Sequence, residues 1–179
     1  DLSDKFSFFH KKAIDLAMEA IEHTQKNVLI AGCLPPLVWS YRPDKAPDYE
    51  RCVDLYLQIV REQEEDVDLF ICETMASLKE AKAAVSAAKT SGKPVWCGLT
   101  LEDNENCELR SGEKLLDSVI ALQSFGQEEF LLNCSFPEVI NKGIDILSKN
   151  TTFFGGYANG FTSIEPLKTA SNVSVLSAR

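Results

Sequence analysis

Short apolar runs alternate with longer amphipathic stretches along this chain, and the alternation predicts an α/β fold. Apolar runs that suit buried strands cover 28–31, 68–72, 95–101, 130–132 and 152–158. Between them, apolar residues recur at helical spacing over 5–22, 49–63, 77–90, 111–126 and 137–147. The strand runs are apolar on both faces instead of alternating. They therefore indicate a parallel sheet that helices cover.

Two architectures fit this order of elements. One is an open, doubly wound sheet of about five strands. The other is a (β/α)₈ barrel, which needs roughly 250 residues. With 179 residues the chain has the length of one domain, spanning 1–179, and is short for a complete barrel. The pattern alone therefore favours the open sheet.

Residues at the predicted helix starts indicate how the helices are capped. Ser77, with Glu80 three residues later, has the spacing of a capping box. Pro137 suits a first helical turn, and Ser135 is then the expected N-cap. The tail from residue 159 is predicted to be polar and irregular.

The charge and the cysteines narrow the class of protein. A formal net charge of -9 argues against a nucleic-acid surface and against an anionic membrane as partner. No apolar run approaches the length of a membrane span. Four of the six cysteines lie in or just after apolar runs, which predicts reduced thiols in the cytoplasm. The two histidines, His10 and His23, lie away from the strand ends, so a histidine-based metal site is not expected.

Two strand ends carry candidate chemistry. Cys134 directly follows the predicted strand 130–132 and precedes a helix, at the edge of the sheet where α/β folds bind ligands. Its thiol could be a metal ligand, a nucleophile or a small buried hydrophobe. The loop after the first strand carries Trp39 and Tyr41. These aromatics predict either a binding loop or packing on the rim.

Four stretches together resemble the homocysteine S-methyltransferase family, a zinc-dependent barrel that includes the betaine and S-methylmethionine enzymes. The stretches are 31–36 (AGCLPP) with 47–49 (PDY), 69–75 (LFICETM) with 80–81, 131–138 (LLNCSFPE), and 156–161 (GYANGF). The resemblance runs from the first strand to about residue 167. It implies a (β/α)₈ TIM-type barrel, of which this chain supplies about five middle strands while the first strands and the last are missing.

The resemblance also implies a reaction. A methyl group would pass from a cationic sulfonium or ammonium donor to the zinc-bound thiolate of homocysteine, giving methionine. Free thiols are mostly protonated at neutral pH, and zinc would bind and deprotonate the substrate thiol. By resemblance, Cys134 is a zinc ligand, Glu73 holds the ammonium of homocysteine and Asn133 orients the site. The resemblance implies four further substrate-binding residues, Tyr157, Asn159, Trp39 and Tyr41. The three aromatic ones, together with Phe161, would face the positive charge of the methyl donor.

One departure from the family concerns the metal. The family completes its zinc site with two adjacent cysteines, and this chain has no Cys-Cys pair. Cys72 precedes Glu73 in an extended strand, so the two side chains point to opposite faces. If Glu73 faces the site, Cys72 faces the helices.

Two other functions stay open on the sequence. A relative without the complete metal site could be a non-catalytic module that binds a small molecule or assembles with another chain. An open-sheet enzyme could instead use Cys134 as a nucleophile. The expected partners are homocysteine and a methyl donor, and self-association into a homo-oligomer is compatible with the sequence.

Overall fold

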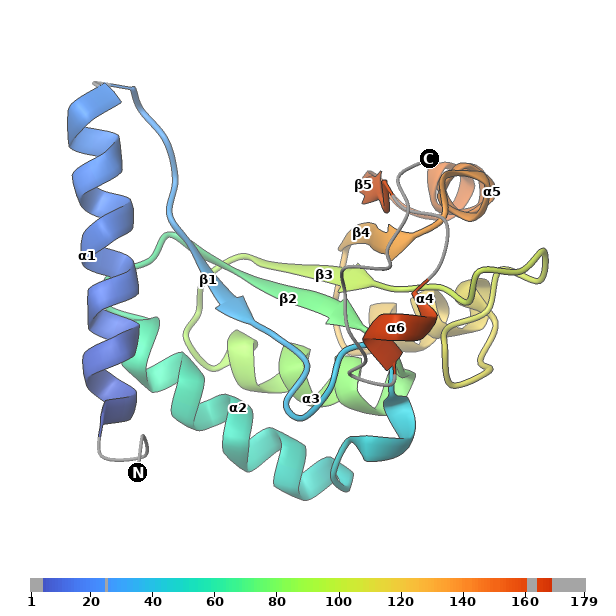
Figure 1. Cartoon of the computed structure of the whole chain (residues 1–179), viewed down its shortest axis with the longest axis horizontal. Helices are drawn as coiled ribbons and strands as arrows, with labels where there is room; N and C mark the ends of the chain where they lie inside the picture. The colour runs from blue at the N-terminus through green and yellow to red at the C-terminus, as the bar shows by residue number, and fades with distance from the viewer. Residues whose placement is uncertain (1–4, 25, 161–163, 169–179) are drawn as a thin grey trace.

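The computed structural model describes residues 5–24, 26–160 and 164–168. Five parallel strands pair in chain order to form one sheet (Figure 1). They are β1 (Ala31–Leu34), β2 (Leu69–Met75), β3 (Val95–Leu99), β4 (Glu129–Ser135) and β5 (Phe153–Ala158). Because every strand runs the same way, all five carboxyl ends meet at one edge of the sheet.

Helices lead into the sheet and connect its strands. They are α1 (Phe6–Thr24), the 3₁₀ helix η2 (Pro43–Lys45), α2 (Tyr49–Gln63), α3 (Leu78–Lys89), α4 (Leu115–Gln123), α5 (Pro137–Asn150) and α6 (Glu165–Lys168). Helices α2 and α3 lie together under one face of the sheet (Figure 1). The short helix α6 lies in the tail that the sequence predicts to be irregular.

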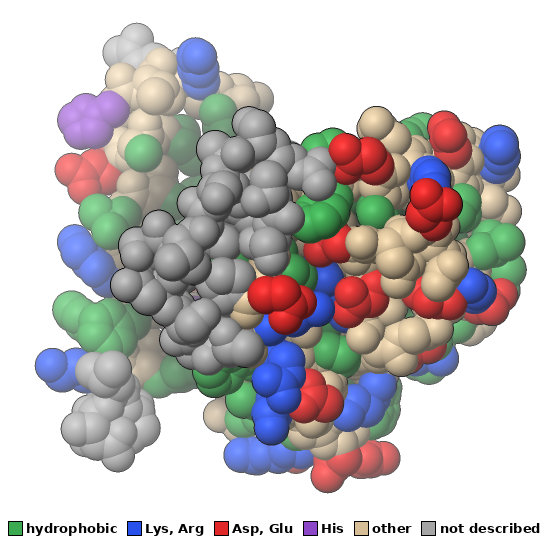
Figure 2. Space-filling model, turned by 45° about the vertical axis from the view of Figure 1, so that its right-hand side comes forward, with side chains coloured by type: hydrophobic (Ala, Val, Ile, Leu, Met, Phe, Trp, Pro, Cys, Tyr) green, Lys and Arg blue, Asp and Glu red, His purple; other side chains and the backbone are tan. Residues whose placement is uncertain are grey.

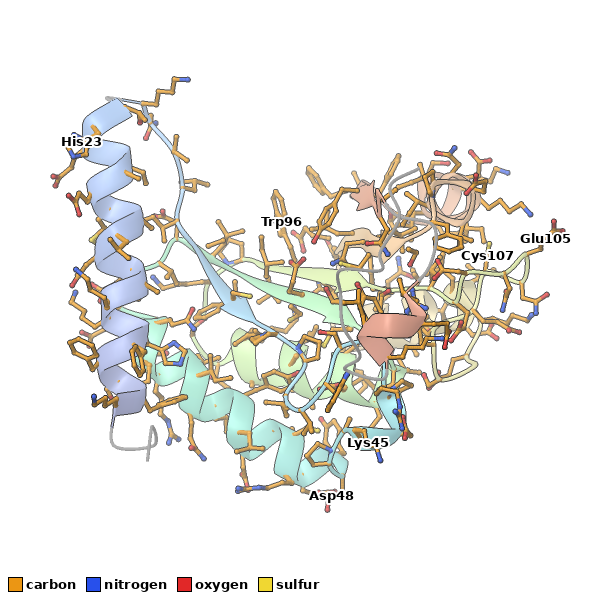
Figure 3. The ribbon with its side chains drawn as sticks, viewed as in Figure 1. His23, Lys45, Asp48, Trp96, Glu105 and Cys107 are labelled. Atoms are coloured by element: carbon orange, nitrogen blue, oxygen red, sulfur yellow. The ribbon has the colours of Figure 1, made fainter. Side chains whose placement is uncertain are left out.

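The two faces of the sheet differ in burial. Side chains toward the helices, such as Phe70, Cys97 and Phe130, are fully buried. On the other face Trp96 is 41% exposed and projects away from α2 and α3 (Figure 3). Within the described ranges, helices therefore cover one face of the sheet, and the expectation of a parallel sheet that helices cover is confirmed for that face. The uncovered face is nevertheless partly apolar, which explains the continuous apolar runs in the sequence.

The first strand lies later than its apolar run predicts. Ile30 is hydrogen-bonded to Asp68 through its N–H (2.7 Å to Oδ2) and its carbonyl (2.8 Å to N), and the strand begins only after it. Cys33 and Leu34, which the sequence places in a loop, instead pair with Ile71 and Cys72 of β2. Pairing with the neighbouring strand overrides the loop signal of the glycine and prolines around them.

The helix after β3 begins at Leu115 and not near residue 111. Ser111 is held by the carbonyl of Ala76 through its N–H (3.2 Å) and its hydroxyl (3.1 Å), and Gly112 has a φ of 98°. The preceding segment also forms an isolated bridge between Glu108 and Lys114. These contacts keep the chain out of a helix until residue 115.

The predicted caps are confirmed in one case. The Ser77 hydroxyl accepts from the N–H of Glu80 (3.2 Å), as an N-cap should. The carboxylate of Glu80, however, accepts from the N–H of Leu37 (3.0 Å) and the hydroxyl of Tyr56 (3.1 Å), so it fastens a loop instead of closing a capping box. Ser135 is not the cap of α5; the N-cap is Phe136.

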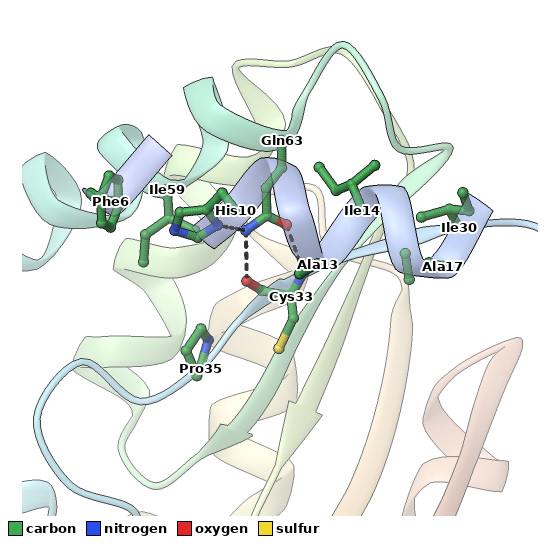
Figure 4. Close-up of a pocket in the computed structure, with 11 residues that line it drawn as sticks. Phe6, His10, Ala13, Ile14, Ala17, Ile30, Cys33, Pro35, Ile59 and Gln63 are labelled. Carbon is green, nitrogen blue, oxygen red and sulfur yellow. Dashed lines mark hydrogen bonds between the residues drawn. The ribbon is translucent and has the colours of Figure 1, made fainter. Parts of the chain in front are cut away.

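A hollow of about 480 Å³ lies between α1, β1 and α2 (Figure 4). Its wall is mostly apolar, and its polar groups serve the edge of the sheet. The Gln63 amide accepts from the N–H of Cys33 (3.0 Å), donates to the Cys33 carbonyl (3.3 Å) and lies 3.0 Å from Nδ1 of His10. Gln63 thus pairs the N–H and carbonyl of Cys33 on the edge of β1 that faces away from β2. Its role is therefore structural.

We predict that Tyr56→Phe lowers the free energy of unfolding by about 1–3 kcal/mol, because it removes the phenol donor shared by the Pro35 carbonyl and the buried Glu80 carboxylate, which keeps the Leu37 N–H. Burial, together with the negative charge of Glu80, raises the pKa of the Tyr56 phenol, so the hydroxyl keeps its proton for these bonds. Urea unfolding measures the change. The control is Tyr49→Phe, because the Tyr49 hydroxyl contacts the hydroxyl of the part-buried Ser86. An equal loss of stability in both variants would contradict the prediction.

Candidate functional site

Two strands end in the same unusual backbone conformation. Thr74 on β2 and Cys134 on β4 have φ angles of 58° and 57°, and the strand pairing shifts register at both places. The left-handed region is unfavourable for residues with a Cβ, and such residues persist where their surroundings hold them. A bulge of this kind redirects a side chain. Here it brings the Thr74 hydroxyl within 3.5 Å of the Cys134 sulfur.

An amide connects three strand ends. The Nδ2 of Asn133, on β4, lies 2.9 Å from Oε1 of Glu73, 2.7 Å from the Thr74 hydroxyl and 3.1 Å from the Tyr157 hydroxyl. An amide carries two N–H groups, so these acceptors share its donors. The Tyr157 hydroxyl also donates to Oε1 of Glu73 (2.6 Å). Both bonds reach the same carboxylate oxygen, which orients Glu73 and leaves Oε2 for a ligand.

A glycine makes room for this contact. To reach β2 from β4, the Asn133 side chain passes over β3 at Gly98. A Cβ at Gly98 would lie 3.3 Å from Oδ1 of Asn133 and 3.0 Å from the carbonyl oxygen of Cys72, closer than side chains normally approach. The absence of a side chain at Gly98 thus allows the amide to lie 2% exposed across the sheet.

The Cys134 thiol borders this cluster. Its sulfur lies 3.3 Å from Nδ2 of Asn133 and 3.7 Å from the Tyr157 hydroxyl, and the residue is partly exposed. By contrast, Cys72 and Cys97 are fully buried on the helix side, and burial raises the pKa of the Cys97 thiol to about 12. The expectation that Cys72 faces the helices is confirmed. Cys134 therefore presents a reachable thiol beside the Glu73 carboxylate.

Tyr41 closes the site from the loop after β1. It is 8% exposed, and its ring lies 4.8 Å from the guanidinium carbon of Arg110. Burial, and then the nearby Cys134 side chain, raises the pKa of the Tyr41 phenol, while the positive charge of Arg110 lowers it. Asn159 is itself buried, and its Nδ2 has no hydrogen-bond partner in the described structure. Tyr41 and Asn159 thus adjoin Cys134.

The remaining predicted aromatics have different surroundings. Trp39 donates its indole N–H to the Leu167 carbonyl (3.1 Å), so it joins its loop to α6. Phe161 lies outside the described residues. The structure therefore brings together Glu73, Asn133, Cys134 and Tyr157, with Tyr41 and Asn159 beside them, while Trp39 serves the packing of the loop.

Arg110 is a residue of the site that sequence reasoning missed. Its side chain is fully buried, and its Nη2 donates to the Cys134 carbonyl (3.1 Å) and to Oδ2 of Asp103 (3.3 Å). The sequence signal was a single arginine that follows the acidic segment 102–108. Around it, Lys168 pairs with Glu102 (3.6 Å), and acidic and basic side chains intermix over this side of the molecule (Figure 2).

Metal ligands are incomplete in this part of the protein. Among the described residues, no three His, Cys, Asp or Glu side chains are grouped so that they could hold a metal ion. Cys134 offers a soft ligand by itself. No described helix has the length and apolar character needed to cross a membrane.

Comparison with known proteins bears on this site. The family model described as homocysteine S-methyltransferase matches residues 1–174. A search of curated proteins finds no match.

Solved structures show the same fold. The metallated form of the homocysteine methyltransferase MmuM from Escherichia coli has a TM-score of 0.77 at 22% identity, over 90% of this chain and 61% of that chain. Its oxidized form has a TM-score of 0.75 at 23% identity, over 92% and 60%. The carboxyl transferase domain of Rhizobium etli pyruvate carboxylase matches less well, with a TM-score of 0.51 at 12% identity, over 83% of this chain and 26% of that chain.

These comparisons decide between the two architectures. The chain spans about 60% of the length of MmuM and has the fold of part of that barrel, so the prediction of a partial TIM-type barrel is confirmed. The pattern alone favours an open, doubly wound sheet. That prediction is correct only in one respect, since the five strands do not close into a barrel within the described residues.

We predict that the stability that the buried tyrosines contribute declines as the pH rises above about 10, the ordinary pKa of tyrosine. Burial raises the pKa values of Tyr41, Tyr56 and Tyr157 in the folded state. The unfolded chain therefore releases these protons first, so their contribution to stability is complete below this pH and declines above it. Urea midpoints measured between about pH 8 and pH 11 test the decline.

The control for this pH dependence is Tyr41→Phe, which removes one of the protected phenols. Its urea midpoint should fall less steeply with pH than that of the natural sequence. Equal slopes would show that Tyr41 does not contribute to the decline.

Proposed function

Since the chain belongs to the homocysteine S-methyltransferase family, which matches it over residues 1–174, we propose that it forms the central part of an enzyme that methylates homocysteine. The methyl group would come from a cationic sulfonium or ammonium donor, and the product would be methionine. We further propose that 1–179 is one domain and that the protein works in the cytoplasm in methionine biosynthesis.

The observation that carries this proposal is the placement of Glu73 beside Cys134. Homocysteine has an ammonium group and a thiol. An oriented carboxylate suits the ammonium through a charge-assisted hydrogen bond. Asn133 and Tyr157 hold Oε1 of Glu73, and the Cys134 sulfur lies 3.3 Å from the same Asn133 nitrogen. One molecule could thus contact both groups, with its thiol near the Cys134 sulfur.

Among the aromatics, Tyr157 is best placed for a cationic donor. It is 56% exposed, and its hydroxyl is already anchored at Glu73, so its ring is presented in a defined position. The Tyr41 ring contacts Arg110, and the Trp39 indole is bonded to α6. We therefore propose that the Tyr157 ring contacts the cationic group of the methyl donor. Tyr41 and Trp39 could do so only after their present contacts with Arg110 and α6 are broken.

Zinc is the cofactor we propose. Cysteine thiolates are preferred zinc ligands, and the partly exposed Cys134 thiol suits one position. When bound, zinc would lower the pKa of the homocysteine thiol so that it reacts as a thiolate. The other zinc ligands would have to come from residues other than Cys134, which is the one cysteine that matches a zinc ligand of the family. Asn133 and Thr74, which contact the Cys134 sulfur, would orient it.

The alternative is a non-catalytic relative that binds a small amino acid or assembles with another chain. This alternative would hold if the natural full-length protein, like the residues 1–179, had no Cys-Cys pair to complete the metal ligands. A small-molecule module would still use Glu73 to bind an ammonium group.

An assay of the natural full-length protein distinguishes the two. Homocysteine is offered with S-methylmethionine, S-adenosylmethionine or betaine, methionine is quantified, and zinc is measured in the same sample. We expect methionine from at least one donor and about one zinc per chain. If the protein binds homocysteine but forms no methionine and contains no zinc, the enzyme proposal is wrong and the non-catalytic binding module is favoured.

We predict that Glu73→Gln raises the KM for homocysteine by about 10–100-fold, because a charge-assisted hydrogen bond to the ammonium becomes neutral. The value of kcat should change less, since the carboxylate contacts a part of the substrate that does not react. Steady-state kinetics with varied homocysteine measure both constants. The matched control is Glu129→Gln, at the opposite end of β4 on the same face, which should leave the KM unchanged. A KM unaffected by Glu73→Gln would remove Glu73 from the ammonium site.

A further inference from the structure

Three consecutive residues at the end of β4 are held by one segment, the loop 100–114 that follows β3. The Ser135 hydroxyl accepts from the N–H of Leu101 (2.8 Å) and donates to its carbonyl (3.0 Å). The N–H of Phe136 donates to Oδ1 of Asp103 (2.7 Å). The remaining residue of the three, Cys134, is held through its backbone carbonyl.

Arg110 supplies the main contact to that carbonyl. Its Nη2 lies 3.1 Å from the Cys134 oxygen, and the Thr100 hydroxyl lies 3.3 Å from the same oxygen. Nε of Arg110 donates to the Thr100 hydroxyl (3.1 Å), so the guanidinium also orients the second donor. Two donors of one planar group thereby fix the direction of the Cys134 peptide.

The charge of Arg110 is compensated where it is buried. Its Nη2 lies 3.3 Å from Asp103, and its Nη1 lies 3.7 Å from Glu102. Asp103 is the residue that also accepts from the N–H of Phe136, so the ion pair connects the Cys134 carbonyl to the backbone two residues later. A buried guanidinium is costly without such partners, and here one of them, Asp103, also bonds the same turn.

The conformation that these contacts hold is an unfavourable one. Cys134 has a φ of 57°, and the strand pairing shifts register between Asn133 and Ser135. In this conformation the Cys134 sulfur lies within 3.5 Å of the Thr74 hydroxyl. A return of residue 134 to an extended conformation would turn the side chain away from Thr74, because successive side chains of a regular strand point to opposite faces.

We propose that Arg110 is a positioning residue that keeps Cys134 in its left-handed conformation and so aims the thiol at the Glu73–Asn133–Tyr157 cluster. Its contact with the Tyr41 ring, at 4.8 Å, keeps the loop after β1 over the same thiol. The value of this positioning for methyl transfer rests on the proposed function, whereas the effect on Cys134 itself does not.

The test compares Arg110→Lys in two backgrounds of the natural full-length protein, Cys134→Ala and Cys134→Gly. Lysine keeps the charge beside Asp103 and Glu102 but lacks the fork that reaches both the Cys134 carbonyl and Thr100. Alanine removes the thiol and keeps the Cβ that makes the left-handed conformation unfavourable. Glycine removes both and adopts this conformation freely. The two backgrounds therefore isolate the backbone strain.

We expect Arg110→Lys to lower the urea midpoint at most half as much in the Cys134→Ala background as in the Cys134→Gly background, because residue 134 relaxes and relieves its backbone strain only where it carries a Cβ. Equal shifts would show that Arg110 stabilises the fold without holding the conformation of Cys134, and would overturn the proposal. Arg61→Lys, an exposed position on α2, is the control and should shift neither midpoint. A larger shift in the alanine background, or failure to fold in both backgrounds, also contradicts the proposal.

A second readout uses the otherwise natural enzyme. There Arg110→Lys should lower kcat for methyl transfer about tenfold or more, with a smaller change in the KM for homocysteine, because the ammonium site at Glu73 stays intact. An unchanged kcat would contradict the functional part of the proposal. If the protein transfers no methyl group at all, the proposed function fails, and the comparison of midpoints still decides the role of Arg110.

Discussion

Parallel pairing in chain order is the constraint on which the rest of this structure depends. Each strand must be followed by a crossing helix, so every strand ends at the same edge of the sheet. Residues 73, 133 and 157, which are far apart in sequence, then meet at the ends of β2, β4 and β5. This arrangement lets the amide of Asn133 bond to residues on two other strands. It spans from β4 to β2 only because Gly98 on β3 has no side chain in its path.

The sequence predicts the elements of the fold well and their boundaries less well. Helix α2 occupies 49–63 as the apolar spacing predicts, since its apolar stripe packs against α3 and the sheet. The strand β1 is displaced because strand pairing, and not the apolar run, decides which residues extend. Glu73 and Cys134 could be placed at one edge from the sequence, since both directly follow apolar runs. Their bonding partners could not, because hydrogen bonds depend on the rotation of each strand and on the bulges at Thr74 and Cys134.

The loops show most clearly what a single sequence conceals. Arg110 lies 24 residues from Cys134 in sequence, and no local pattern links the two. Its burial follows from the fold of the loop 100–114, which forms isolated bridges instead of the early helix that the pattern predicts. The same uncertainty affects the aromatics. Tyr41 and Trp39 are two residues apart, yet one contacts Arg110 and the other bonds to α6.

The conformation of Cys134 sets a requirement that glycine cannot meet. Glycine would relieve the backbone there but has no thiol to offer. A thiol in a regular strand would avoid the strain, yet it would point away from Thr74 and from the cluster around Asn133. The chain instead combines a residue of unfavourable φ with a buried arginine, two acidic partners and a threonine hydroxyl from one loop. Two side-chain donors on one carbonyl, one of them a buried arginine that needs its own acidic partners, are difficult to explain by folding alone, because an ordinary strand end needs none of them. The arrangement is understandable if the direction of this one thiol matters to the protein.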